Sequence, residues 1–127
     1  MSKHYSLQTK PGEYDAILFD GLDWVVQQVG SRGMRVILVF TDFWEHHGGV
    51  SQYLEWAGSS STTKNAFYTS ISCKRMYKDN ARALINHFNP YTQLHYRDDP
   101  TVMAWELINE PRCRNCPGPL QSWLEEM

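Results

Sequence analysis

The chain has 127 residues, a formal net charge of -2 and 42% hydrophobic residues, which allows one modest domain with a hydrophobic core. The near-neutral charge offers no basic surface for nucleic acid, and no run of about 18 apolar residues is present to span a membrane. The first residues, Met1–Tyr5, lack the apolar stretch of a signal peptide.

The first predicted helix follows a short polar segment. Residues 1–13 end at Pro11 and Gly12 and are predicted to form a loop. From Tyr14 onward, apolar residues recur at three- and four-residue spacing, which predicts one apolar helical face. Gly30 and Gly33 are expected to end the helix, because glycine favours the position after a helix. The apolar face consists of Leu18, Leu22, Val25, Val26 and Val29.

A predicted strand and a long connection come next. The run Arg35–Phe40 is short and continuously apolar, which favours a parallel strand buried on both faces. The connection Thr41–Thr63 exceeds the usual loop length of about 12–15 residues, and such loops are usually functional or disordered. Its first half, with Trp44 and Trp56, indicates a functional role. Its second half, Gly58–Thr63, is rich in serine and threonine and is expected to be a flexible tip.

The second half of the chain repeats the alternation of helix and strand. A helix is predicted over Ser70–Asn86, with Asn89–Pro90 after it and a turn at Asp98–Pro100. A strand over Val102–Leu107 and a last helix over Leu120–Met127 follow. This order predicts an α/β fold with a parallel sheet and crossover helices. The apolar stripe of the helix consists of Tyr77, Ala81, Leu84, Ile85 and Phe88.

Polar residues follow the second predicted strand at once. Pro111 cannot join a strand ladder, so Asn109 and Glu110 are expected at the strand's carboxyl end. A carboxylate held there is a candidate general acid/base, and glycoside hydrolysis commonly uses two such groups beside the scissile bond. Asn109 would hold a sugar hydroxyl. The alternative is that Asn109–Pro111 form a turn that merely ends the strand. Glu106 lies inside the strand, and a buried and paired structural role is expected for it.

The surrounding sequence resembles a known family. The segment Trp105-Glu-Leu-Ile-Asn-Glu-Pro-Arg-Cys113 is similar to the fourth strand of endo-β-1,4-mannanases of glycoside hydrolase family 5. The resemblance implies a (β/α)8 TIM barrel, which needs roughly 250 residues. The chain would then be a partial catalytic domain over 1–127, covering about strands 3 to 4 with flanking helices. Further similar blocks are Pro11–Asp15, Gly21–Asp23, Gly48–Ala57, Tyr96–Ala104 and Leu120–Met127.

The resemblance also implies roles for individual residues. Glu110 would be the acid/base of a retaining mechanism, with Asn109 as a substrate-binding neighbour. Arg112 would face the leaving-group side of the cleft, and Trp44 the glycone side. The structural alternatives are a surface ion pair for Arg112 and an ordinary packing role for Trp44.

The chain departs from the family pattern in several places. Asp42 and Phe43 stand where the family often has two asparagines, and Asn80 replaces a common histidine. The nucleophilic glutamate of the seventh strand has no counterpart in these 127 residues. We therefore expect the isolated chain to be inactive and poorly soluble, since unpaired barrel strands invite aggregation.

The cysteines allow several interpretations. Cys113 and Cys116 form a Cys-x-x-Cys motif, which a redox site, a zinc site or a local disulfide would explain. The zinc site would need two more ligands, and His46 and His47 are expected to be a solvated loop pair. The resemblance favours the disulfide, which would fix the loop beside Glu110 and add little global stability. Cys73 is expected to be a buried or free thiol.

The implied activity is endo-hydrolysis of β-1,4-mannosidic bonds in mannan, glucomannan or galactomannan, by a secreted enzyme without metal or organic cofactor. The alternatives are another retaining barrel glycosidase, cellulase-like or exo-mannosidase, and a non-catalytic carbohydrate-binding protein. Neither nucleic acid nor membrane is expected as a partner, and the sequence does not indicate an oligomeric state.

Overall fold

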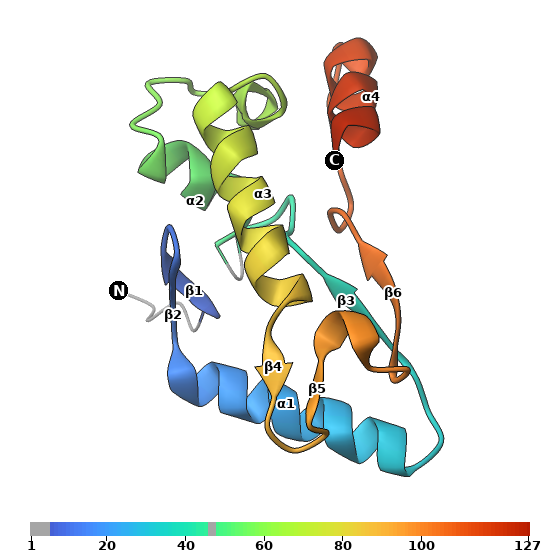
Figure 1. Ribbon diagram of the computed structural model, residues 1–127. Helices are drawn as coiled ribbons and strands as arrows, with labels where there is room; N and C mark the ends of the chain where they lie inside the picture. The colour runs from blue at the N-terminus through green and yellow to red at the C-terminus, as the bar shows by residue number, and fades with distance from the viewer. Residues whose placement is uncertain (1–5, 46–47) are drawn as a thin grey trace.

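The computed structural model of the chain describes residues 6–45 and 48–127. The predicted loop pair His46 and His47 and the first five residues lie outside these ranges. β3 (Val36–Val39) and β6 (Val102–Glu106) lie side by side and pair in parallel (Figure 1). The register joins Leu38 to Trp105, and the helices between the two strands make the crossover that a parallel pair requires. The predicted parallel arrangement is confirmed.

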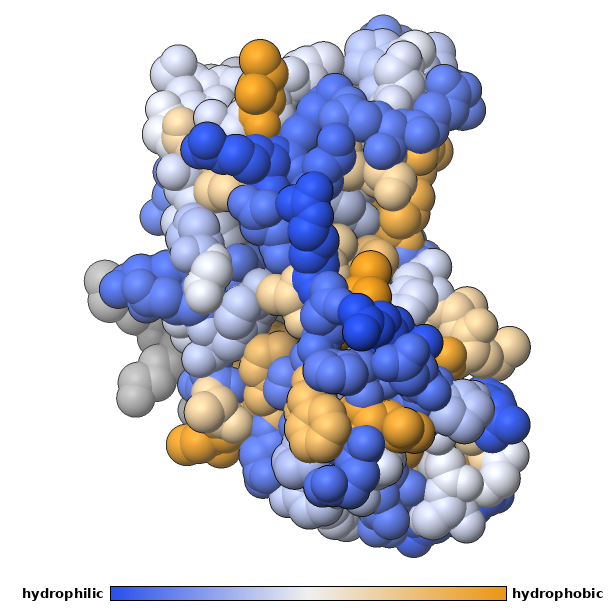
Figure 2. Space-filling model, in the orientation of Figure 1, coloured by the Kyte–Doolittle hydropathy of each residue, from blue (hydrophilic) through white to orange (hydrophobic). Residues whose placement is uncertain are grey.

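The pair is not buried on both faces, so that prediction is wrong for the described chain. Ile37, Val39 and Met103 are 57%, 42% and 63% exposed, whereas Phe40 is buried. Successive strand residues point to opposite faces, and the described helices pack against one face only. Figure 2 shows hydrophobic residues reaching the surface between hydrophilic ones in several places.

The segment before the first helix is a small hairpin rather than a loop. β1 (Gln8–Lys10) and β2 (Glu13–Tyr14) pair antiparallel around the turn at Pro11 and Gly12. Gly12 has a φ of 78°, a conformation that side-chain-bearing residues rarely adopt. Strands of two or three residues are too short to show a recognisable alternation of apolar and polar residues, so the sequence did not predict this hairpin.

Helix α1 (Ala16–Ser31) begins after Asp15, whose carboxylate accepts hydrogen bonds from two backbone N–H groups of the first turn. It therefore starts two residues later than predicted. Of the predicted apolar face, Val26 is buried but Val25 is 44% exposed. Gly30 lies within the last turn, where a Cβ would come 2.4 Å from the Thr101 hydroxyl, so a larger residue would force Thr101 to move.

The long connection contains regular structure that was not predicted. Helix α2 (Gly49–Trp56) lies in its first half, and the 3-10 helix η1 (Lys64–Tyr68) follows it. The stretch Gly58–Thr63 between them is exposed and has neither helix nor strand.

Helix α3 (Ile71–Ile85) agrees with the prediction and is capped by Ser70. Phe88, predicted on its apolar stripe, lies instead in the hairpin of β4 (Phe88–Asn89) and β5 (Leu94–His95) and is 45% exposed. The 3-10 helix η2 (Tyr96–Asp98) and helix α4 (Pro117–Glu126) complete the fold.

The core lies between α2, η1, α3, α4 and the ends of the two strands. Trp123 of α4 is fully buried and contacts the rings of Phe67, Tyr68 and Tyr77. The Tyr77 hydroxyl donates a hydrogen bond of 2.7 Å to the Leu107 carbonyl, which ties the core to the segment that leads to Glu110. The described helices include none long and apolar enough to cross a membrane.

A second buried cluster joins α1 to the β4–β5 region. The Asp23 carboxylate contacts His87 Nε2 at 2.9 Å and accepts a hydrogen bond of 2.6 Å from the Tyr96 hydroxyl. The Asp23 carbonyl accepts a hydrogen bond from the Asn89 side chain. These contacts hold α1 against a part of the chain that is far away in sequence.

Candidate active site

The carboxyl ends of β3 and β6 continue side by side beyond the strands. The Asn109 N–H donates to the Thr41 carbonyl, and the Phe43 N–H donates to the Asn109 carbonyl. Asp42 and Asn109 form an isolated parallel bridge. The two strand ends therefore deliver the segments Thr41–Trp44 and Leu107–Glu110 to one edge, where α/β barrels place their catalytic groups.

Glu110 lies at this edge and is exposed. Its φ is 46°, which is unusual for a residue with a side chain. The Trp44 Nε1–H donates to Glu110 Oε2 at 2.8 Å, and Arg112 Nη2 donates to the same oxygen at 3.3 Å. Among the described residues, no hydrogen-bond donor reaches Oε1.

Three of the predicted site residues therefore meet. The guanidinium carbon of Arg112 lies 5.1 Å from the centre of the Trp44 ring, within the range of a cation–π contact. The Arg112 and Glu110 side chains are 57% and 54% exposed, so their ion pair alone stabilises little. The shared contact with Trp44 makes the arrangement more specific than a surface ion pair.

Asn109 is held by Asp42. The Asn109 side-chain amide donates to Asp42 Oδ2 at 3.2 Å, and the backbone N–H of Trp44 donates to Asp42 Oδ1 at 2.8 Å. Both carboxylate oxygens of Asp42 are thus engaged in shaping the strand end. The departure at position 42, noted in the sequence, supplies a hydrogen-bond acceptor for the predicted substrate-binding asparagine.

The hydrogen bonds lower the pKa of Glu110. The largest cause is the Trp44 N–H, followed by the hydrogen bond from Arg112, since both donors favour the charged form. Asp42 acts in the opposite direction. With these donors on Oε2, the Glu110 carboxyl is ionised at neutral pH, which suits a general base. A general acid there requires a raised pKa, which burial of Glu110 or a further carboxylate nearby would supply.

Lys64 is a neighbour of this site that sequence reasoning missed. Its Nζ donates to the Phe43 carbonyl at 3.1 Å and lies 3.2 Å from a Glu45 carboxylate oxygen. It also lies 4.9 Å from the centre of the Phe43 ring and 5.6 Å from that of Trp44. No local pattern signals a contact across 21 residues of sequence.

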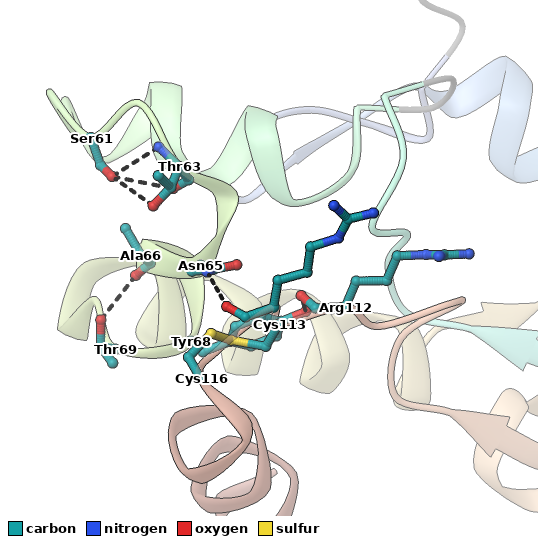
Figure 3. The surroundings of a disulfide bond; sticks show 10 residues. Ser61, Thr63, Asn65, Ala66, Tyr68, Thr69, Arg112, Cys113 and Cys116 are labelled. Atoms are coloured by element: carbon teal, nitrogen blue, oxygen red, sulfur yellow. Dashed lines mark hydrogen bonds between the residues drawn. A yellow bond between two sulfur atoms is a disulfide. The ribbon is translucent and has the colours of Figure 1, made fainter.

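The cysteine loop lies beside Glu110. Cys113 and Cys116 form a disulfide with Cα atoms 5.2 Å apart, and Figure 3 shows Arg112 next to it. The Tyr68 hydroxyl donates to the Arg112 carbonyl at 3.2 Å, so η1 supports this loop. The part of the chain that the structure describes has no group of three or more His, Cys, Asp or Glu residues placed to hold a metal ion.

The structure also places the other residues that the sequence analysis singled out. Glu106 is exposed, so the predicted buried and paired role is wrong, because its side chain points to the uncovered side of the sheet. Cys73 is a buried free thiol, as expected. Asn80 is buried, donates to the Phe40 carbonyl and accepts from the Tyr14 hydroxyl, so it has a structural role.

A cavity of about 530 Å³ opens next to these strand ends, between the N-terminal hairpin, α1 and α2. Asp42 and Asn109 line it, but Glu110 does not. The cavity therefore borders the candidate site without containing the carboxylate that the chemistry needs.

The chain is similar to several characterised proteins. Residues 2–127 match the model of the family described as GH family 5 beta-mannosidase-like. Mannan endo-1,4-beta-mannosidase 7 of Arabidopsis thaliana is 41% identical over 96% of this chain and 30% of its own length. Mannan endo-1,4-beta-mannosidase 8 of Oryza sativa subsp. japonica is 42% identical, with coverage of 96% and 34%. The chain thus spans about a third of the length of these relatives.

The fold is also similar to those of solved mannanase structures. The endo-beta-1,4-mannanase from Thermotoga petrophila superimposes with a TM-score of 0.85 at 36% identity, over 93% of this chain and 27% of that one. The endo-1,4-beta-mannanase from Rhizomucor miehei has a TM-score of 0.77 at 30% identity, over 83% and 32%.

The fold is that of part of a (β/α)8 barrel, and the described strands do not by themselves close a barrel. The chain belongs to the GH family 5 beta-mannosidase-like family. The predicted resemblance and fold class are confirmed.

Proposed function

We propose that the chain is part of the catalytic domain of an endo-β-1,4-mannanase and supplies its acid/base, Glu110. The observation that carries the proposal is the strand-end carboxylate with two donors on one oxygen, in a chain whose relatives bear the names of mannan endo-1,4-beta-mannosidases. The substrates would be mannan, glucomannan and galactomannan. The disulfide beside the site suits an oxidising compartment, which supports a secreted enzyme.

The proposed mechanism is a double displacement. Protonated Glu110 gives its proton to the glycosidic oxygen as the bond from that oxygen to the anomeric carbon breaks. A second carboxylate, from a part of the enzyme outside this chain, forms a bond to the anomeric carbon. Glu110 then takes a proton from water, and the resulting hydroxide displaces this carboxylate. Because the donors occupy Oε2, the transferable proton would sit on Oε1.

The neighbours would have separate roles. Asn109, held by Asp42, would bind a substrate hydroxyl close to the reacting carbon. Arg112 would contact the leaving group with the donors that Glu110 does not use. Trp44 would offer its ring to a sugar of the glycone while its N–H stays on Glu110.

The decisive experiment uses the full-length enzyme and the variant Glu110→Ala. We expect hydrolysis of unactivated mannan to fall by about 10² to 10⁴, because general acid catalysis is lost. The kcat/KM for an aryl mannobioside with a dinitrophenol leaving group should change little, since this leaving group needs no proton. Azide should restore turnover and yield a β-mannosyl azide.

A matched control is Glu125→Ala, which removes an exposed carboxylate on α4 and should leave activity unchanged. Normal hydrolysis of mannan by Glu110→Ala would overturn the proposed role. A wild-type enzyme that hydrolyses cellulose and not mannan would overturn the proposed substrate.

A further inference from the structure

The Lys64 ammonium is fixed against the strand end that carries Trp44. It donates to the Phe43 carbonyl at 3.1 Å and lies within 6 Å of the centres of two aromatic rings. Its side chain is only 25% exposed. Partial exclusion of water strengthens both the hydrogen bond and the attraction of a cation to a ring.

The Trp44 ring is held from several directions. Phe43 packs edge-on against it, with ring centres 5.5 Å apart and planes at 87°. The backbone N–H of Trp44 donates to Asp42, and the Arg112 guanidinium lies over the ring. These contacts aim the indole N–H, and the atom it meets is Glu110 Oε2.

We propose that Lys64 is a positioning residue for Glu110 and acts through Trp44. Its contacts with Phe43 and Trp44 hold the indole so that the N–H stays on Oε2 and leaves Oε1 to carry the proton. This inference rests on the proposed function of Glu110.

The ion pair of Lys64 with Glu45 does not explain this placement. Glu45 is 68% exposed, and exposed ion pairs contribute little. The charged groups around the site are Arg112 and Asp42 beside Glu110, and Lys64 and Glu45 beside Trp44. Of these, Lys64 contacts both rings, which makes it the group to remove in a test.

The first test measures kcat/KM of the full-length enzyme for two substrates, a mannooligosaccharide and dinitrophenyl mannobioside. For Lys64→Met we expect a loss of about two- to fivefold with the oligosaccharide and a smaller one with the activated glycoside, whose leaving group needs no proton. Lys64→Arg keeps the cation and should retain the wild-type ratio. Lys64→Gln repeats the removal of charge should Lys64→Met fold poorly.

The matched control is Lys74→Met. Lys74 is 23% exposed and pairs with Glu126, as Lys64 pairs with Glu45. It lies on α3, however, and its ammonium lies over no aromatic ring of residues 6–45 and 48–127. Its removal should change neither substrate's kcat/KM. An equal loss with both substrates for Lys64→Met would indicate a general structural role and overturn the inference.

The second test is a double-mutant cycle with Trp44→Phe, which keeps a ring and removes the N–H. In this background Lys64→Met should have no further effect on the ratio of the two kcat/KM values, because the bond it positions is absent. A full additional loss would overturn the inference and leave the proposed function intact. Unaltered hydrolysis of mannan by Glu110→Ala would instead overturn both.

Discussion

The backbone of Gly49 packs directly against the carbonyl of Trp44. A Cβ at position 49 would lie 2.1 Å from the Trp44 oxygen and 2.6 Å from the Asp42 oxygen, and the φ of Gly49 is +60°. The start of α2 thus supports the turn that presents Trp44 to Glu110. Only glycine combines this backbone conformation with so close an approach.

Gly49→Ala tests this contact. The substitution forces backbone atoms of Asp42 and Trp44 to move, and strain of this kind costs on the order of 1–3 kcal/mol. We expect a lower melting temperature of the full-length enzyme and a loss of mannan hydrolysis. Gly118→Ala is the control, because a Cβ there meets nothing within 4 Å. Equal stability of the two variants would contradict the proposed support.

Arg112→Gln tests the electrostatics of Glu110. The Arg112 hydrogen bond helps to lower the pKa of Glu110, so its loss raises that pKa. Glu110 then stays protonated to higher pH, and the alkaline limb of the pH profile of kcat/KM for mannooligosaccharide should shift to higher pH. Arg114→Gln, an exposed change two residues away, should leave the limb in place. A downward shift for Arg112→Gln would contradict the assignment.

Removal of the disulfide should affect the loop around Arg112 more than the stability of the whole protein. The Cys113–Cys116 bridge closes a loop of four residues, and the chain-entropy model gives at most about 2 kcal/mol for so short a loop. Cys116→Ser should therefore change the melting temperature only slightly. It should raise KM, because Arg112 loses part of its support. The check compares both quantities with those of Cys73→Ser, whose thiol lies in the core and whose change should mainly lower stability.

The exposed sheet face leads to an expectation for the 127-residue chain by itself. Ile37 and Val39 on this face, and Met103 at the register shift of β6, present apolar side chains to solvent, and β3 and β6 each have an unpaired edge within the described residues. We expect the isolated chain to aggregate on expression and to lack mannanase activity. Size-exclusion chromatography and a reducing-sugar assay test this, and a monomeric, active preparation would refute it.

The sequence predicted those elements whose signals are local and long. Helix α3 shows its apolar period and its Ser70 cap, and the parallel pair follows from two apolar runs separated by helical segments. The edge position of Glu110 followed from Pro111. Helix α2 was missed because its eight residues, which begin with Gly49, were assigned to the long connection Thr41–Thr63.

Other features depend on contacts that no local pattern contains. The exposure of Glu106 depends on which face of the sheet the helices cover, and alternation along a strand does not specify this. Lys64 reaches Phe43 only because η1 brings it back across 21 residues. The convergence of Trp44 and Arg112 on one oxygen likewise requires the paired strand ends.

The Asp23 cluster has a consequence for the order of folding. Its contacts with His87 and Tyr96 close loops of 64 and 73 residues, whereas the contacts within α1 are local. Closure of longer loops costs more chain entropy, so these bonds should form late. During synthesis, α1 leaves the ribosome before the β4–β5 region, so the Asp23 carboxylate lacks these partners until Tyr96 has also emerged.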